Sequence, residues 1–576
     1  MKPLLLGHDA GGRPLRLTSE EREAHMHVIG SSGSGKSKFL EQMIREDLGN
    51  KQGFCLIDPH GTLYKEVLDY ASHKVLKRDI VLLDLSKPEF IIGFNPFRKA
   101  RDGDVSVQVD RRIRATMHAW GVENADQTPT LERTLRLIFT TLLELNMSFQ
   151  EAQYLIDFNS SELRSRLVQK IASPLIRREW EELEQLKAKD WRTEVLSAKN
   201  RLFRLLTSRT LGRFFGSHVS SIDLAEIIEQ GKILLVNLAP SDELSDENGR
   251  IFGSLLVNEF FEVARRRKAA PGKSLVPYYL YLDEFQTFVG LDIAAMLDQV
   301  RKYKLFTVLA HQRFGQLNEN LQDAVLTNCR IKAVFGGLPV EAARMMAEEL
   351  FIGKLDPMRI KVAIYQTKFW PKYARDKVYG RSTSSGTSTG TGRNESSGST
   401  SSTMEGTFFA PQEWFSGTGV TSVSLSSGMS SGFQAGSHSN ETEFDGTSES
   451  ESDVPIMLPV PFQELSSVQY MSTEEQLLEL TAALKEQFGR HCFIKIHHRE
   501  TQPLRVPFIA THYTRQTALD SYKTRLLEQG GAMSSELVDD ANAKEHERWN
   551  VRTTENASHQ SQPESTEDAA DFLGRE

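Results

Sequence analysis

Cysteine is scarce in this chain of 576 residues, which holds three, Cys55, Cys329 and Cys492, far apart in sequence. They form neither a disulfide framework nor a CxxC metal-binding pattern, and this predicts a reducing, cytoplasmic location. Long apolar runs are missing as well, because no stretch reaches the roughly 18 residues of a transmembrane helix. The apolar run at the start is too short for a signal peptide. We therefore expect a cytoplasmic protein that is peripheral to a membrane only through a partner.

An excess of basic charge is also missing. The 69 Lys and Arg residues stand against 77 Asp and Glu residues, for a formal net charge of −8. This balance argues against a protein that is basic throughout, but it leaves room for a locally basic channel. Charged residues make up 25% and hydrophobic residues 39%, as in soluble globular proteins. The length suits two to four domains.

Short apolar runs near the start alternate with a helical pattern. Residues 25–30, 53–58 and 80–85 read as buried strands, and 37–48 has helical spacing. This alternation predicts a parallel sheet covered on both faces, with 1–97 as the first part of an α/β core. Helical periodicity then predicts an inserted all-helical domain at 98–216. Strand patterns return in 217–380, which we expect to be the second part of the same core.

The composition changes after residue 380. Ser, Gly and Thr dominate 381–453, which predicts a disordered linker because too little apolar surface is available to offset the ordering entropy. Residues 454–530 have one helical pattern and strand-like pieces and predict a small C-terminal α+β region. The acidic segment 531–576 is expected to be disordered.

The motif GSSGSGKS matches the phosphate-binding P-loop, GxxxxGK[ST], and lies between a predicted strand and a predicted helix. In such a loop, successive backbone N–H groups surround phosphate oxygens at a helix N-terminus. Lys36 would reach the β- and γ-phosphates of ATP, and the Ser37 hydroxyl would bind Mg²⁺. The alternative is a surface loop that matches by chance. The predicted nucleotide-binding residues are Gly30, Ser31, Ser32, Gly33, Ser34, Gly35, Lys36, Ser37 and Lys38.

Two adjacent acids, Asp283 and Glu284, follow the apolar run LYL. Ligands of open parallel sheets bind at the carboxyl ends of the strands, where these acids would lie. We expect Asp283 to hold Mg²⁺ through water and Glu284 to polarise the attacking water. Solvated loop acids are the alternative.

Three further residues are candidates for supporting roles. Gln312 ends another apolar run and could sense the γ-phosphate, or it could simply end the strand. Arg301 is the candidate for an arginine that reaches a neighbouring subunit's site, with Arg330 and Arg344 as lesser ones, against the reading of a solvated helix-end cation. Asp58 is expected to make a supporting hydrogen bond or to serve a turn.

In this order, GSSGSGKS, FCLIDPHGTL, FNPF, KILLVNLA, LYLDEFQTF, RKYKL and AHQ resemble the HerA–FtsK class of P-loop motors. Within that class the sequence is most similar to the coupling-protein ATPases of type IV secretion and conjugative DNA transfer. The resemblance covers about residues 20–350. It implies a RecA-like core that binds ATP and Mg²⁺, a homohexamer around DNA, and ATP hydrolysis that moves the DNA. Partner proteins in secretion or DNA processing are also implied.

Contacts with DNA would need cations facing a channel. One group of candidates lies in the helical insertion: Arg192, Lys199, Arg201, Arg204, Arg209 and Arg213. A second basic stretch, with interleaved aromatic residues, spans 359–381. A solvated helix face and a basic linker edge are the plainer readings.

The sequence thus predicts an ATP-driven DNA translocase. Two alternatives remain, a protein-substrate or assembly ATPase that does not grip DNA, and a regulatory nucleotide switch.

Overall fold

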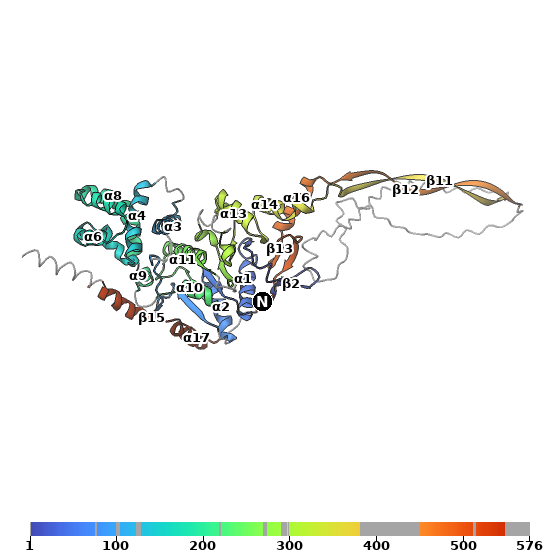
Figure 1. The fold of residues 1–576 in the computed structure, drawn as a ribbon. Helices are drawn as coiled ribbons and strands as arrows, with labels where there is room; N and C mark the ends of the chain where they lie inside the picture. The colour runs from blue at the N-terminus through green and yellow to red at the C-terminus, as the bar shows by residue number, and fades with distance from the viewer. Residues whose placement is uncertain are drawn as a thin grey trace, which may run out of the picture. The chain divides into compact units, whose positions relative to one another are not determined.

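The structure is a computed structural model, and it describes residues 2–74, 76, 78–98, 104–122, 128–217, 221–268, 274–289, 297, 299–380, 450–510, 514–545 and 547. The chain divides into two compact units, drawn in Figure 1. One unit combines Met1–Ala342 with Gln487–Glu576, and the other is Ala343–Glu486. Most of the predicted linker, 381–449, lies outside the described residues.

The first unit is built on an 11-stranded sheet with the order β2-β1-β14-β13-β10-β3-β9-β8-β4-β7-β5. From β10 to β5 all neighbouring strands are parallel. The parallel strands are β3 (Met26–Ile29), β4 (Phe54–Asp58), β5 (Ile80–Asp84), β7 (Ile233–Asn237), β8 (Tyr278–Leu282), β9 (Leu305–His311) and β10 (Ile331–Phe335). Together with the helical insertion, this confirms the predicted RecA-like fold with a mostly parallel sheet.

Antiparallel strands from both ends of the chain extend the sheet beyond β10. They are β1 (Leu4–His8), β2 (Pro14–Leu17), β13 (His491–Ile496) and β14 (Gln502–Arg505). We predicted a small separate region at 454–530, whereas residues 492–496 of β13 pair with β10 of the core sheet. The sequence gives no indication of this pairing, because about 150 residues separate the two strands.

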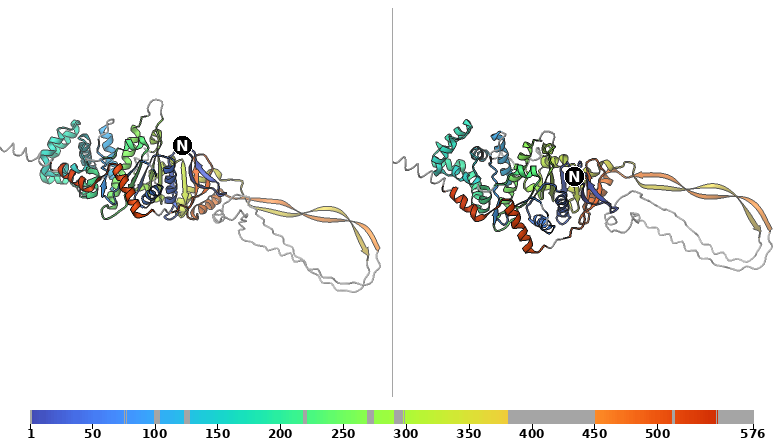
Figure 2. Two further views of the ribbon diagram at one scale, coloured as in Figure 1. Left: turned by 90° about the horizontal axis from the view of Figure 1, so that it is seen from below. Right: turned by 60° about the horizontal axis from the view of Figure 1, so that its bottom comes forward.

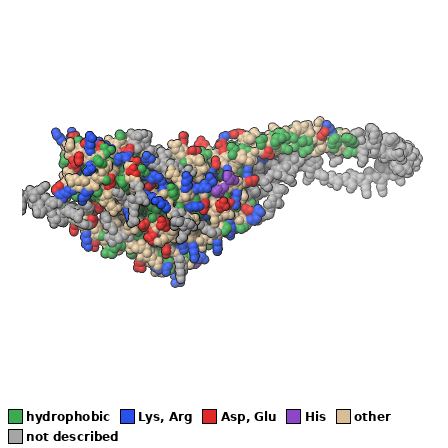
Figure 3. All heavy atoms as spheres, in the orientation of Figure 1, with side chains coloured by type: hydrophobic (Ala, Val, Ile, Leu, Met, Phe, Trp, Pro, Cys, Tyr) green, Lys and Arg blue, Asp and Glu red, His purple; other side chains and the backbone are tan. Residues whose placement is uncertain are grey.

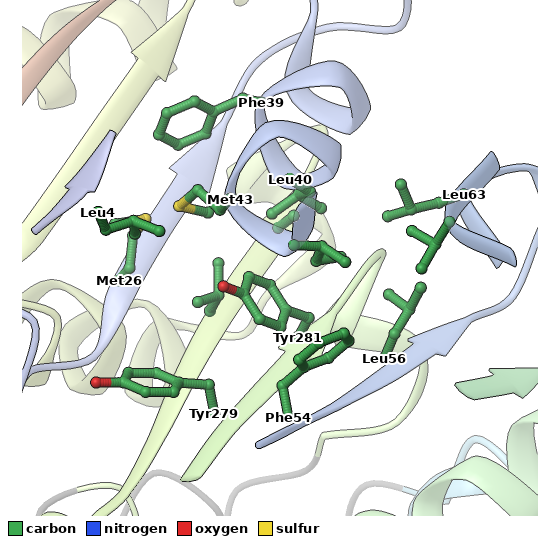
Figure 4. Packing of buried hydrophobic residues seen from close by; sticks show 14 of the residues in the cluster. Leu4, Met26, Phe39, Leu40, Met43, Phe54, Leu56, Leu63, Tyr279 and Tyr281 are labelled. Atoms are coloured by element: carbon green, nitrogen blue, oxygen red, sulfur yellow. The ribbon is translucent and has the colours of Figure 1, made fainter. Parts of the chain in front are cut away.

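Helices cover both faces of the sheet. The helices α1 (Lys36–Gly49), α2 (Thr62–His73) and α17 (Gln516–Gln529) share one apolar core with the sheet. Figure 4 shows Phe39, Leu40 and Met43 of α1 packed among strand residues such as Met26 and Tyr281. On the opposite face, Phe260 of α11 (Asp246–Arg266) stacks on Tyr278 of β8. Both faces are therefore buried, which explains why the core strands are almost wholly apolar.

The helical insertion lies between β6 (Phe90–Ile91) and β7, as the sequence predicted. It includes α3 (Val105–Ala119), α4 (Pro129–Glu144), α5 (Ala152–Ile156), α6 (Ser161–Val168), α7 (Pro174–Glu184), α8 (Ala188–Leu206) and α9 (Arg209–Gly216), with the short turns η2 (Phe149–Glu151) and η3 (Phe158–Ser160). The chain returns to the sheet through α10 (Leu224–Gln230).

The second unit holds a long two-stranded antiparallel ribbon, visible in Figure 2. Its strands are β11 (Ile360–Gly380) and β12 (Ser450–Tyr470), next to α14 (Val340–Phe351), η7 (Ile352–Lys354) and α16 (Thr473–Lys485). The end of the predicted linker, 450–453, therefore belongs to a strand. Part of the predicted acidic tail is also ordered in the first unit, since β15 (Met533–Ser534) pairs with β6 and residues 535–545 are helical.

A charged cluster is buried between α1 and the sheet. Asp47 is fully buried and pairs with Arg22, and it accepts a hydrogen bond of 2.7 Å from the Tyr281 hydroxyl. The Arg22 guanidinium also lies 3.8 Å from the centre of the Tyr279 ring. The cluster ties the segment before β3 to α1 and β8, the elements that carry the P-loop and the acidic pair.

We predict that Asp47→Ala lowers the free energy of unfolding by about 3–5 kcal/mol, because it leaves the Arg22 charge buried without its partner. Tyr281→Phe removes only one hydrogen bond and should cost about 1 kcal/mol. Urea unfolding followed by circular dichroism measures both. Equal stability of Asp47→Ala and the wild-type protein would contradict the assigned role.

Candidate nucleotide site

The P-loop forms a tight turn between β3 and α1. Gly33 and Gly35 have φ angles of 76° and 113°, in the left-handed region that favours glycine. A Cβ atom added at Gly33 would meet no atom within 4 Å, so this side of the loop is open. The glycine conformations and the open space at Gly33 are compatible with a phosphate group beside the loop.

Lys36 is the first residue of α1, and it is only 6% exposed. Its ammonium donates to the carbonyl oxygens of Gly30, at 2.6 Å, and Ser31, at 3.0 Å. Burial lowers the pKa of Lys36, and the nearby carboxylates of Glu284 and Asp283 oppose that shift. The structure therefore brings the P-loop lysine and the acidic pair to one place.

The acidic pair follows β8 directly. Asp283 is 6% exposed, and burial raises its pKa to about 6, with further contributions from Asp58 and Glu284 and opposition from Lys36. Glu284 has a φ of 46°, which is unusual for a residue with a Cβ, and it begins the turn η4 (Phe285–Thr287). Such strain costs about 1–3 kcal/mol and is often found at functional sites.

Both carboxylate oxygens of Glu284 are held by side-chain amides. The Gln312 amide, just after β9, donates to Oε1 at 2.6 Å, and the Gln286 amide donates to Oε2 at 2.8 Å. Gln312 thus contacts the acid that we expect to orient water. Gln286 was missed in the sequence analysis, although it lies two residues after Glu284 in the motif LYLDEFQ.

A buried histidine pair lies beside this network. His27 of β3 and His311 of β9 join through their Nε2 atoms at 2.7 Å, and His311 Nδ1 lies 3.2 Å from the Arg313 carbonyl oxygen. Since a carbonyl only accepts, Nδ1 of His311 carries the proton, and His27 Nε2–H is then the donor to His311. Burial lowers the pKa of both residues, so both are neutral at physiological pH. The pair joins the P-loop strand to the Gln312 strand.

Asp58 supports the turn after β4. Its carboxylate accepts backbone N–H groups of His60, at 2.9 Å, and Tyr64, at 2.8 Å. It is fully buried and also helps to raise the pKa of Asp283. Both expected roles, turn formation and support of the site, are therefore compatible with its contacts.

The remaining predicted residues lie elsewhere. Lys38 pairs with Glu41 within α1 at 2.8 Å and with Glu66 of α2 at 2.6 Å. Arg301, in η5 (Arg301–Tyr303), precedes β9, whereas Gln312 follows it, so the two residues lie at opposite ends of that strand. Its Nε donates to the Glu23 carbonyl oxygen at 3.2 Å. Among the lesser candidates, Arg330 is exposed and Arg344 pairs with Glu474 at 2.7 Å.

Several of the cations proposed for DNA contact have acidic partners. Asp539 pairs with Arg213 at 2.7 Å and with Arg209 at 2.8 Å. Arg192 and Lys199 of α8 are exposed and form no ion pair with a described residue. On the face drawn in Figure 3, acidic and basic side chains are interspersed over the helical domain.

The donor set fits ATP with Mg²⁺. Among the described residues, no group of three or more His, Cys, Asp or Glu side chains is arranged to bind a metal. Mg²⁺ with nucleotides needs only one or two protein oxygens, because phosphates and water supply the others. The exposed Ser37 hydroxyl and the Asp283 carboxylate would supply them. No helix of the described part of the chain is both long enough and apolar enough to span a bilayer.

Comparison with known proteins supports this assignment. Residues 9–257 match the family model of the central domain of the helicase HerA. Residues 277–359 match the model of the TraM recognition site of TraD and TraG. The first match covers the P-loop, and the second covers Asp283, Glu284 and Gln312.

These matches confirm that the chain resembles the HerA–FtsK class of P-loop ATPases. Within that class, the second model adds the likeness to TraD and TraG, and so to coupling proteins. No curated protein sequence matches the chain.

Among solved structures, the conjugative coupling protein TrwBΔN70 is 13% identical, with a TM-score of 0.46, over 90% of this chain and 92% of its own. TrwB with the ATP analogue ADPNP is 17% identical, with a TM-score of 0.42, over 60% and 78%. VirB4 of Thermoanaerobacter pseudethanolicus is 12% identical, with a TM-score of 0.40, over 60% and 87%.

The raised pKa of Asp283 predicts a pH-dependent effect of Asp283→Asn. The folded-state pKa of about 6 lies above the ordinary 3.8, so the wild-type protein loses stability as the pH rises from about 4 through 6. The asparagine variant avoids this loss and should be more stable than wild type by about 1–3 kcal/mol at pH 8. The difference should shrink near pH 4.

Urea unfolding at several pH values, in EDTA and without nucleotide, measures this difference. The exposed Asp323 of α13 (Glu319–Asn328) provides a control, because Asp323→Asn should show no such pH dependence. A variant Asp283→Asn that is less stable than wild type at pH 8 would contradict the assigned environment.

Proposed function

We propose that this chain hydrolyses ATP in the presence of Mg²⁺ and uses the energy to translocate DNA, as a ring of identical subunits. One observation carries the hydrolysis step. Buried Lys36 lies next to Asp283 and Glu284, and Gln312 donates a 2.6 Å hydrogen bond to Glu284. This set supplies a phosphate-binding cation, a metal ligand and a base for water in one cluster.

Each residue of the cluster has a distinct task in the proposed mechanism. The P-loop N–H groups and Lys36 bind the phosphates. Ser37 and Asp283 would hold Mg²⁺, which would neutralise charge on the phosphate oxygens. Glu284, whose carboxylate is fixed by two amides, orients the attacking water. Loss of the γ-phosphate changes the contacts of Gln312, and β9 transmits this change to the rest of the sheet.

The ring supplies what one chain lacks. Arginines that reach across an interface stabilise charge on the transferred phosphoryl group and raise the rate by about 10³–10⁵-fold. We assign this role to Arg301, which precedes β9 and so lies at the opposite end of that strand from Gln312, where its Nε donates to the Glu23 carbonyl oxygen at 3.2 Å. The likeness to HerA and to TraD and TraG supports a homohexamer around DNA, with secretion or DNA-processing proteins as partners.

We predict that Glu284→Gln lowers the rate of ATP hydrolysis at least 100-fold, because the amide cannot accept a proton from water. ATP binding should remain, since the P-loop is unchanged. Lys36→Ala should lose binding as well as turnover. Phosphate release and equilibrium binding of a fluorescent ATP analogue separate these effects.

The matched control for Glu284→Gln is Glu319→Gln. Glu319 is an exposed acid at the start of α13, and its substitution should leave both readouts unchanged. Wild-type turnover in Glu284→Gln would rule out the proposed role of this acid.

We further predict that DNA stimulates the ATPase and that this stimulation weakens as salt rises. Replacing Arg192 and Lys199 by alanine should reduce the stimulation and lower the slope of its salt dependence by about one per lost phosphate contact. Arg178→Ala is the control, because Arg178 in α7 already pairs with Glu182 at 3.2 Å. An ATPase indifferent to single- and double-stranded DNA at all salt concentrations would instead favour a protein-substrate or assembly ATPase.

A further inference from the structure

The C-terminal hairpin reaches the P-loop. β13 is antiparallel to β10, and its first residues lie opposite the end of that strand, with Cys492 paired to Phe335. Arg505 at the end of β14 pairs with His491 at the start of β13. The segments before β13 and after β14 therefore both lie at the carboxyl ends of the parallel strands, where the candidate nucleotide site is.

The turn before β13 packs directly on the P-loop. The Arg490 backbone N–H donates to the Ser34 carbonyl oxygen at 2.8 Å. A Cβ atom added at Gly35 would lie 2.8 Å from Arg490 Cα, closer than side chains allow. Arg490 itself has a φ of 67°, a left-handed conformation that a residue with a Cβ rarely adopts. The third glycine of the P-loop thus makes room for this turn.

The strand order indicates which part of a bound nucleotide would lie next to this turn. β3, which leads into the P-loop, lies between β9 on one side and β10 with β13 on the other. Glu284 and Gln312 follow β8 and β9, so the γ-phosphate belongs on the β9 side. The nucleoside then leaves the P-loop on the opposite side, toward Arg490.

An exposed aromatic side chain stands at that position. Phe508, three residues after β14, is 79% exposed, and the Arg490 guanidinium lies 5.4 Å from the centre of its ring. Single exposed apolar side chains are common on protein surfaces, but this one lies beside a guanidinium in the turn that packs on the P-loop. A planar cation beside an aromatic ring is a suitable surface for stacking a nucleotide base.

We propose that Arg490 and Phe508 bind the nucleoside part of ATP, with the base stacked against them. This inference rests on the proposed ATP binding at the P-loop. The C-terminal hairpin then completes the site, and a segment that follows the long Ser/Gly/Thr-rich stretch becomes necessary for nucleotide affinity.

The test compares two probes, ATP and inorganic tripolyphosphate, which has the phosphates but no nucleoside. Isothermal titration calorimetry gives the affinity of the full-length chain for each. Arg490→Asn removes the cation and keeps a residue that tolerates positive φ, while Phe508→Ala alters only an exposed side chain. Each should weaken ATP binding by about 5- to 100-fold, the range expected for losing one stacking partner. Tripolyphosphate affinity should change less than about twofold.

Arg499→Ala is the matched control. Arg499 lies in the turn between β13 and β14, at the opposite end of the hairpin, where it pairs with Glu21. Its substitution should leave ATP affinity unchanged, and thermal melts establish that every variant is folded.

The outcomes separate this inference from the proposed function. If wild type binds ATP and both variants bind it equally well, the nucleoside assignment is overturned while ATP binding stands. If the variants lose ATP and tripolyphosphate to the same degree, the nucleoside assignment is also overturned. If wild type binds no ATP, the proposed function fails, and this inference fails with it.

Discussion

The candidate nucleotide site depends on keeping charges of opposite sign together out of water. Lys36 and Asp283 are each 6% exposed, and isolated charges at such positions would be costly. Their mutual attraction, with Glu284 nearby, offsets part of that cost. The parallel sheet brings the charges together, because the carboxyl ends of parallel strands all lie on the same side of the sheet. A phosphate group and a divalent cation that bind at these strand ends would meet charges that are already in position.

Residues from distant parts of the chain meet at these strand ends. The P-loop follows β3, the acids follow β8, Gln312 follows β9, and Arg490 precedes β13. Hydrogen bonds join these elements in pairs, between His27 and His311 and between Gln312 and Glu284. A change in the contacts of Gln312 therefore has a direct connection to the P-loop strand. This arrangement suits a protein in which hydrolysis must alter the position of whole elements.

Local patterns in the sequence were enough to predict the mostly parallel sheet, the helical insertion and the resemblance to HerA–FtsK ATPases. The P-loop, and the apolar strand that ends in two acids, are short motifs formed by consecutive residues, so each can be recognised from the sequence alone. The pairing of β13 with β10 could not be predicted in this way, because it joins strands about 150 residues apart and neither carries a pattern specific to the other. Arg490 was missed for the same reason, since it meets the P-loop only through the fold. Gln286 lies only two residues from its partner Glu284, but the motif alone does not show that its amide folds back onto the carboxylate.

The central claim is that Lys36, Asp283 and Glu284 surround one triphosphate, and a structure of the protein with ADP, beryllium fluoride and Mg²⁺ tests it most directly. The account predicts Mg²⁺ next to the Ser37 hydroxyl and the Asp283 carboxylate, directly or through water. It also predicts the beryllium fluoride group within reach of Glu284 and Gln312. Nucleotide bound at another place, or bound at the P-loop with its terminal group directed away from Glu284, would contradict it.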